Sequence, residues 1–185
     1  MVSLNRVVMH RSSRRLIGRL NPATLDTAEI FGRFGKRFAF KSYTQFGNPT
    51  YDICAGPFID PKTVRQFDLI LANQVWEHLD RPYTALAHVQ QMLRPGGYFW
   101  IAVPFFIPFH AAPNDNSRWS ARGLKNLLIE ALFDGSRGIA RQWSNRAATA
   151  RNLEPDWPPS FDKNTDDLAN DPKMLLCAWA LAQKK

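Results

Sequence analysis

Polar side chains that could do chemistry lie in three segments, each at the predicted carboxyl end of a β-strand. Asp52 belongs to a short strand-like stretch at residues 51–54, residues 73–78 follow an apolar run, and residues 105–119 follow another. Because the carboxyl ends of parallel strands meet at one edge of a sheet, such loops line a common crevice. We therefore expect the functional site in these three segments.

The third segment offers proton transfer. His110 and Asp115 could form a proton-accepting pair in which Asp115 fixes the imidazole tautomer, while Phe106, Arg118 and Trp119 would contact the substrate and shape its pocket. The alternative is a loop packed by its own side chains, with Asp115 bonded to backbone amides and Arg118 paired locally.

The second segment carries an adjacent acid and imidazole. Of Glu77 and His78, one can face the crevice while the other packs or caps the following helix. We expect His78 to face the substrate as a candidate general base and Glu77 to contact the substrate; a purely structural histidine is the alternative. The spacing of His78, His110 and Asp115 does not support a metal site, and none is predicted.

The elements that must position these loops are clearest in the middle of the chain. Residues 67–73 form a continuous apolar run typical of a strand covered on both faces. Arg81-Pro82 begins a helix that Arg94-Pro95-Gly96-Gly97 ends, and residues 98–103 form a second buried strand. This pattern predicts a βαβ crossover.

The flanking regions predict further elements of the same kind. Ser120 is placed to be the N-cap of a helix, and residues 144–172 are polar and predict a long surface excursion. The remaining predicted elements are a helix at 10–20 and strands at 27–32, 38–46 and 174–181. Strands separated by helices predict an α/β sandwich with a mostly parallel sheet.

The charge is concentrated at one end of the chain. The 185 residues carry a net charge of +8, of which residues 1–41 contribute +7 from nine basic and two acidic side chains. This excludes a domain that is basic over its whole surface. We expect a basic segment at 1–25 and a single α/β domain at 26–185. Residues 6–19 could bind nucleic acid or an anionic surface, and a merely solvated basic helix is the alternative.

The composition favours a globular protein of the cytoplasm. Hydrophobic residues make up 45% of the chain, which excludes disorder of the whole. Cys54 and Cys177 lie in apolar surroundings without metal-ligand spacing, so we expect buried free thiols in a reducing compartment. No apolar run is long enough for a membrane helix.

Two motifs at the right separation carry a family resemblance. Residues 66–79 (QFDLILANQVWEHL) and 92–99 (MLRPGGYF) resemble the FD-hydrophobic-EHL and LKPGG signature of class I S-adenosylmethionine-dependent methyltransferases of the type 11/12 kind. The resemblance implies a three-layer αβα sandwich with a Rossmann-like, mostly parallel seven-stranded sheet whose last strand is antiparallel. It also implies S-adenosylmethionine as cofactor and methyl transfer to an acceptor.

The resemblance also implies a cofactor site. Residues 29–35 (EIFGRFG) are similar to the family's acidic residue and glycine loop, so that Glu29 and Gly32 would hold the amino-acid part of the cofactor; Phe31 and Arg33 stand where the family has glycines. By the same resemblance Asp52, with Ile53, would bind the adenosine, and Asn73 and Gln74 would pass under the methionine part. For Asp52 the alternative is an aspartate that caps a turn.

Two functions follow from these observations. The first is a methyltransferase that transfers the methyl group of the sulfonium to an unidentified acceptor. The alternative is a catalytically inactive methyltransferase-like module that binds a partner or serves as a scaffold, which the altered glycine loop and the basic first segment motivate.

Overall fold

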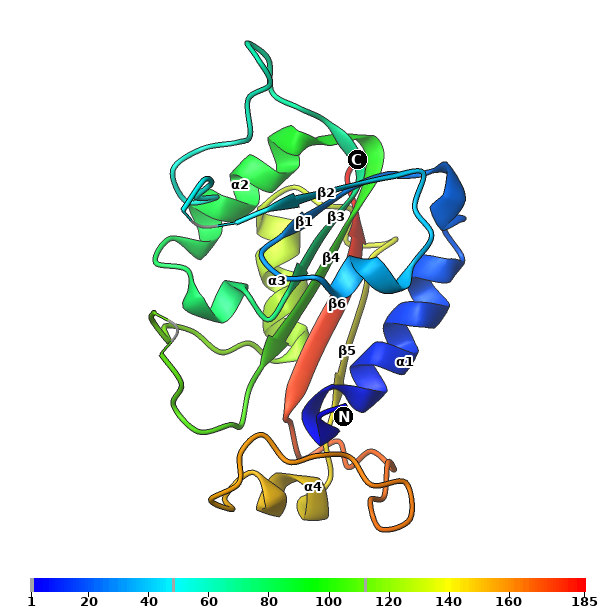
Figure 1. Ribbon diagram of the computed structural model, residues 1–185, viewed down its shortest axis with the longest axis vertical. Coiled ribbons are helices and arrows are strands. Elements are labelled where there is room, and N and C mark those ends of the chain that lie inside the picture. Colours follow the sequence, from blue (N-terminus) through cyan, green and yellow to red (C-terminus); the bar gives the residue numbers. More distant parts are fainter. Residues whose placement is uncertain (1, 48, 112) are drawn as a thin grey trace.

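The computed structural model describes residues 2–47, 49–111 and 113–185, and six of its strands form one sheet (Figure 1). The strand order is β2-β1-β3-β4-β6-β5. The strands are β1 (Asp26–Ile30), β2 (Ser42–Phe46), β3 (Phe67–Asn73), β4 (Leu93–Pro104), β5 (Ile139–Trp143) and β6 (Cys177–Gln183). The helices are α1 (Leu4–Gly18), α2 (Pro82–Met92), α3 (Ala121–Glu130) and α4 (Arg146–Arg151), with short 3-10 turns at Pro22–Thr24, Phe34–Arg37 and Trp76–His78.

The sheet is mostly parallel, as predicted. β2, β1, β3 and β4 run in the same direction, whereas β6 is antiparallel to both of its neighbours, β4 and β5. The antiparallel last strand is therefore confirmed. The α2 helix connects β3 to β4, so the predicted crossover is confirmed as well.

The sheet has six strands where the family resemblance implied seven. Between β2 and β3 the described residues form turns and a single antiparallel bridge, Ile59 to Val64, instead of a strand. Three prolines, Pro49, Pro57 and Pro61, lie in this segment, and each removes a backbone donor that a strand ladder needs. The strand-like stretch at 51–54 is likewise a turn.

Helices cover both faces of the sheet and give the predicted three layers (Figure 1). On one face, apolar side chains of α2 and α3, including Leu86, Val89 and Leu124, pack into the larger core. On the other face, α1 contributes Leu4 and Ile17 to a second core.

The first helix is longer than predicted and begins at Leu4 instead of residue 10. Its buried residues Leu4, Met9 and Ile17 pack against the sheet, while its arginines remain on the outer side. Asn5 and Asn152 exchange hydrogen bonds of 2.6 and 3.0 Å between their side-chain amides, which connects α1 to α4. The predicted basic segment thus shares its core with the sheet.

Local signals account for several boundaries. Pro82 begins α2, and Ser120 caps α3 by accepting a 3.1 Å hydrogen bond from the Gly123 amide, as predicted. Gly96 has φ 76° and lies within β4, between Leu93 and Tyr98, where the pairing with β3 shifts its register. In the part of the chain that the structure describes, no helix combines the length and apolar character needed to span a bilayer.

Candidate functional site

The carboxyl edge of the parallel strands carries an open cavity of about 800 Å³. Its walls come from the loops after β1, β2, β3 and β4, which meet at this edge as parallel topology requires. This volume lies within the range of about 300–1,000 Å³ that small-molecule sites occupy. The lining residues are Phe31, Gly32, Arg33, Gln45, Phe46, Gly47, Asp52, Cys54, Gln74, Val75, His78, Leu79, Asp80, Arg81, Pro113 and Asn114.

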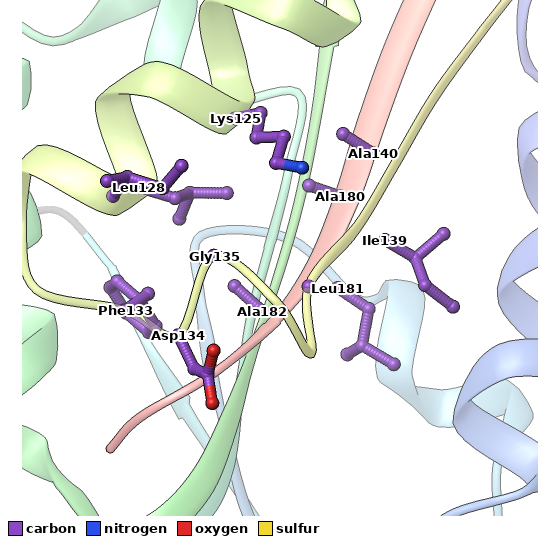
Figure 2. A pocket seen from close by; sticks show the side chains of 12 residues that line it. Lys125, Leu128, Phe133, Asp134, Gly135, Ile139, Ala140, Ala180, Leu181 and Ala182 are labelled. Atoms are coloured by element: carbon purple, nitrogen blue, oxygen red, sulfur yellow. The ribbon is translucent and has the colours of Figure 1, made fainter.

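A second hollow, between α3 and strands β5 and β6, is too small for a ligand. Figure 2 shows Leu128 and Phe133 facing Ala180 and Ala182 across it. Its volume of about 10 Å³ is no more than a single water requires, and its walls are apolar. This hollow is therefore not a candidate ligand site.

Glu29 organises the loop that follows β1. Its side chain is fully buried, and its carboxylate accepts hydrogen bonds from the backbone amides of Phe34 (2.8 Å) and Gly35 (2.6 Å) and from the Tyr43 hydroxyl. Burial, reinforced by the hydrogen bond to Glu29, raises the pKa of Tyr43 far above its usual value, so this hydroxyl stays a donor. Glu29 thus lies beneath the cavity and shapes the loop above it.

Two glycines allow this loop its path. Gly32 has φ 102°, and a Cβ there would lie 3.1 Å from Glu29 Oε1. A Cβ on Gly35 would approach the Tyr43 ring to 2.5 Å and Leu71 Cδ1 to 2.9 Å. The two glycines that the sequence retains are therefore the ones the backbone geometry requires.

Two lining residues that are not glycine adopt the left-handed conformation. Phe31 has φ 51° and Gln74 has φ 60°. Both lie at the point where a strand ends, and the Gln74 amide donates a 2.7 Å hydrogen bond to the Ala102 carbonyl. Strained residues of this kind cluster at binding sites, where the surrounding structure fixes them. Phe31 lines the cavity without filling it.

Asp52 lines the cavity and caps a turn. Its Oδ1 accepts a 2.8 Å hydrogen bond from the Cys54 amide, and its side chain is exposed to the cavity. Ile53, the next residue, is fully buried, and its carbonyl lies 2.7 Å from His88 Nδ1. Asn73, at the end of β3, has a buried Oδ1 that finds no hydrogen-bond partner among the described residues.

The loops after β3 and β4 are joined at the far wall. Asp80 Oδ1 accepts 3.0 Å hydrogen bonds from the side-chain amides of both Asn114 and Asn116. His78 Nδ1 lies 2.6 Å from the Asn114 carbonyl oxygen, so the imidazole carries its proton on Nδ1. His78 therefore reaches the cavity in a fixed orientation.

Asp115 is paired with arginine. Its fully buried carboxylate binds Arg118 through two guanidinium nitrogens and accepts a 2.9 Å hydrogen bond from the His110 amide. The ion pair lowers the pKa of Asp115 to about 2. His110 Nδ1 lies 3.4 Å from Asp115 Oδ2 without a hydrogen bond, and its own pKa is lowered by burial.

The structure distributes the predicted site residues over three zones. Gly32, Asp52, Gln74 and His78 line the cavity, whereas Glu29, Ile53, Asn73 and Glu77 lie behind its walls. The loop after β4 holds His110, Asp115, Phe106, Arg118 and Trp119 outside the cavity lining; Phe106 is exposed and Trp119 packs against the larger core.

Sequence reasoning missed several lining residues. Gln45 lies in register with Glu29 across β1 and β2, and its side-chain amide donates to the Gly32 carbonyl. Asp80, Arg81 and Asn114 also lie in the wall. Asp80 lies two residues beyond the second predicted segment, so a slightly wider boundary would have included it, whereas Asn114 lies within the third segment but was not named as a candidate.

Comparison with known proteins finds a methyltransferase domain in part of the chain. Residues 20–99 match a family model described as a methyltransferase domain, whereas no curated protein sequence matches significantly.

Solved structures share the fold over nearly the whole chain. A S-adenosylmethionine-dependent methyltransferase from Mesorhizobium loti superposes with a TM-score of 0.61 at 13% identity, covering 97% of this chain and 98% of the other. One from Thermotoga maritima, titled a possible histamine N-methyltransferase, gives 0.58 at 15%, covering 98% of both chains. The N-methyltransferase NodS from Bradyrhizobium japonicum WM9, solved with S-adenosylhomocysteine, gives 0.59 at 15%, covering 98% and 88%.

These identities are low, so the superpositions establish the fold alone. The two motifs at residues 66–79 and 92–99 lie within the part of the chain that the family model matches. Residues 20–99 thus match the model of a methyltransferase domain, and the chain shares the fold of solved S-adenosylmethionine-dependent methyltransferases.

Proposed function

We propose that the cavity binds S-adenosylmethionine and that the chain transfers its methyl group to an acceptor that enters beside His78. The observation that carries this proposal is the Glu29-anchored loop at the mouth of an open cavity of about 800 Å³. The acceptor is a nucleophilic oxygen, nitrogen or carbon.

The residues of the cavity fit the cofactor. Gly32 leaves space where a side chain would collide with Glu29, so the loop backbone can approach the amino-acid part of the ligand. Asp52 presents a carboxylate to the cavity, and a carboxylate suits the hydroxyl donors of a ribose. Arg33 adds a cation that can meet the ligand's carboxylate.

The protein would act mainly by positioning. The bound sulfonium supplies an activated methyl group, so the chain must orient the acceptor and exclude water. In a neutral imidazole that donates from Nδ1 to the Asn114 carbonyl the lone pair is on Nε2, and this nitrogen would receive the acceptor proton where there is one. We also propose a cytoplasmic location, because the two buried cysteines are free thiols, which a reducing compartment maintains.

Calorimetric titration with S-adenosylmethionine and S-adenosylhomocysteine tests the proposal. We expect dissociation constants in the micromolar range and at least a tenfold loss of affinity in Asp52→Asn. Asp60→Asn is the matched control, because Asp60 lies in the same segment outside the cavity. Absence of heat and of any thermal shift at millimolar ligand would contradict the proposal, as would equal losses in both variants.

A second groove favours an additional anionic partner. It has a volume of about 440 Å³ between α1 and β5, and its lining includes Arg11, Arg15 and Arg141 without any carboxylate. None of these three arginines forms an ion pair within the described residues. We propose that this groove binds the phosphates of a nucleic acid. The affinity of the protein for the nucleic acid should then fall as the salt concentration rises, through counterion release.

Neutralising the arginines tests this second function without disturbing the core. In Arg11→Gln/Arg15→Gln the affinity for a labelled 20-nucleotide single-stranded RNA should fall at least fivefold, with a smaller salt slope. Arg122→Gln/Lys125→Gln, on α3 at the opposite face, is the control. RNA binding that does not depend on salt, or an equal loss of RNA affinity in the two double variants, would contradict RNA binding in this groove.

A further inference from the structure

Glu77 is a buried acid for which the proposed transfer has no use. Its side chain has no exposed surface, and neither carboxylate oxygen has a hydrogen-bond partner within residues 2–47, 49–111 and 113–185. A carboxylate taken from water without compensation is costly, and a bound cation is one of the few groups that can compensate it.

Two imidazoles lie beside this carboxylate. His78 Nε2 is 3.7 Å from Glu77 Oε1, and the rings of His78 and His110 are 5.1 Å apart between centroids. One ligand atom from each of the three residues lies within 4.8 Å of the others. Two ligand atoms at about 2.1 Å from a tetrahedral zinc ion lie about 3.4 Å apart, so small side-chain rotations would complete the site.

The surroundings hold both imidazoles as metal ligands are usually held. The Asn114 carbonyl fixes the proton of His78 on Nδ1, which leaves the lone pair of Nε2 directed away from that contact. His110 is anchored through its backbone amide to the Asp115–Arg118 pair, and its buried Nδ1 finds no hydrogen-bond partner in the described part of the chain.

We propose that Glu77, His78 and His110 bind a divalent transition-metal ion, with zinc as the best fit, through one carboxylate oxygen and one nitrogen of each imidazole. Two histidines and one carboxylate are a common ligand set of catalytic zinc, which keeps a further position for water or substrate. This set differs from the combination of His78, His110 and Asp115 considered from the sequence, because Arg118 occupies the Asp115 carboxylate.

The site would face the acceptor. His78 lines the cavity, so an ion on its Nε2 would lie at the cavity wall. Resting on the proposed function, the inference assigns the ion the role of binding the acceptor heteroatom and promoting loss of its proton. With the ion bound, His78 is a ligand, and the proton leaves to solvent instead of to Nε2.

Zinc titration of chelator-treated, full-length protein in competition with a chromophoric chelator tests the site. We expect one equivalent per chain with a dissociation constant below one micromolar, and a tenfold to hundredfold loss in Glu77→Gln, His78→Ala and His110→Ala. His88→Ala is the control, because His88 lies on α2 with its Nδ1 at the Ile53 carbonyl. Cobalt binding should give visible d–d absorption that the same three variants lose.

The isosteric Glu77→Gln keeps the test decisive if a histidine variant fails to fold, with far-ultraviolet circular dichroism as the check on folding. Substoichiometric zinc, an unchanged affinity in Glu77→Gln, or an equal loss in His88→Ala would overturn the site. Calorimetry with S-adenosylhomocysteine separates the two proposals. If the protein binds zinc but not S-adenosylhomocysteine, the metal site stands and the proposed cofactor site does not. If it binds S-adenosylhomocysteine but not zinc, only the metal site is overturned.

Discussion

The backbone amide of Gly35 donates a 2.6 Å hydrogen bond to Glu29 Oε2, and a methyl group on Gly35 would lie 3.0 Å from that same oxygen. The acid at the end of β1 and the last glycine of the loop therefore define each other's position. This contact fixes the position of the loop that lines the cavity, although Glu29 itself does not line it.

Gly35→Ala should lower both stability and ligand affinity. The new Cβ would approach the Tyr43 ring to 2.5 Å, and overpacking of this kind costs about 1–3 kcal/mol. Urea denaturation and calorimetry with S-adenosylhomocysteine measure the two effects. Gly56→Ala is the control, because a Cβ there meets nothing within 4 Å. Equal stability of the two variants would show that the loop relaxes without cost.

Asn5→Ala should destabilise the whole fold. It removes both hydrogen bonds of the amide pair and leaves one N–H of buried Asn152 without an acceptor, which costs about 1–3 kcal/mol, while the bonds of Asn152 to Ala148 and Trp157 remain. The shift of the urea midpoint measures this cost. Asn126→Ala, on the exposed side of α3, is the matched control and should change the midpoint little. A midpoint unchanged in Asn5→Ala would mean that α1 does not depend on the pair.

His10 should make stability depend on pH below 6.5. Burial, together with the charges of Arg37, Arg6 and Arg14, lowers its pKa to about 4, whereas the free imidazole titrates near 6.5. Between these values the unfolded chain binds a proton that the folded chain does not, so stability falls as pH decreases from 6.5 to 4 and is constant for this group above 6.5.

The variant His10→Phe isolates this contribution. It keeps an aromatic ring beside Phe34, 5.6 Å away between centroids, and removes the titration. Denaturation at several pH values should therefore show a shallower loss of stability from pH 6.5 to 4 than the wild type. Parallel curves for the two proteins would contradict the lowered pKa of His10.

The two thiols should differ in accessibility to a thiol reagent. Burial raises the pKa of Cys177 to about 12 and also raises that of Cys54, so both should react far more slowly in the native protein than in urea. Cys54 lines the cavity and should react first, and S-adenosylhomocysteine should slow it further. The single variants Cys54→Ala and Cys177→Ala show which labelling rate belongs to which cysteine. Faster labelling of Cys177, or no protection by the ligand, would contradict the placement of the cavity.

Local signals explain which parts of the fold the sequence predicted. The run at 67–73, the proline that begins α2 and the cap at Ser120 each act over a few residues, and each lies where predicted. β5 was missed because Ile139–Trp143 is an edge strand of alternating exposure with little continuous apolar character. The expectation of a seventh strand came from the family resemblance, and the prolines between β2 and β3 explain why the described residues form no strand there.

The site was harder to predict because its geometry depends on contacts distant in sequence. Gly32 and His78, from the loops after β1 and β3, line the cavity, and their roles in binding and catalysis stay predictions. The ion pair of Asp115 with Arg118 was considered only as an alternative, and the proximity of Glu77 to both imidazoles depends on how the loop at 105–119 folds back. The spacing of these residues in the sequence carries no information about how the loop folds back towards Glu77.

The contacts of α1 also determine the order in which the chain can fold. This helix packs against β5 and β6, and the Leu4 amide donates to the Pro159 carbonyl at 2.8 Å. During synthesis the first helix therefore emerges long before β5 and β6. Its core also includes Phe34, Leu69 and Trp100, but the part of its apolar face that packs on β5 and β6 stays without a partner until these strands are made. Completion of the native state waits for these most distant contacts, which predicts slow folding and a need for protection of the nascent chain.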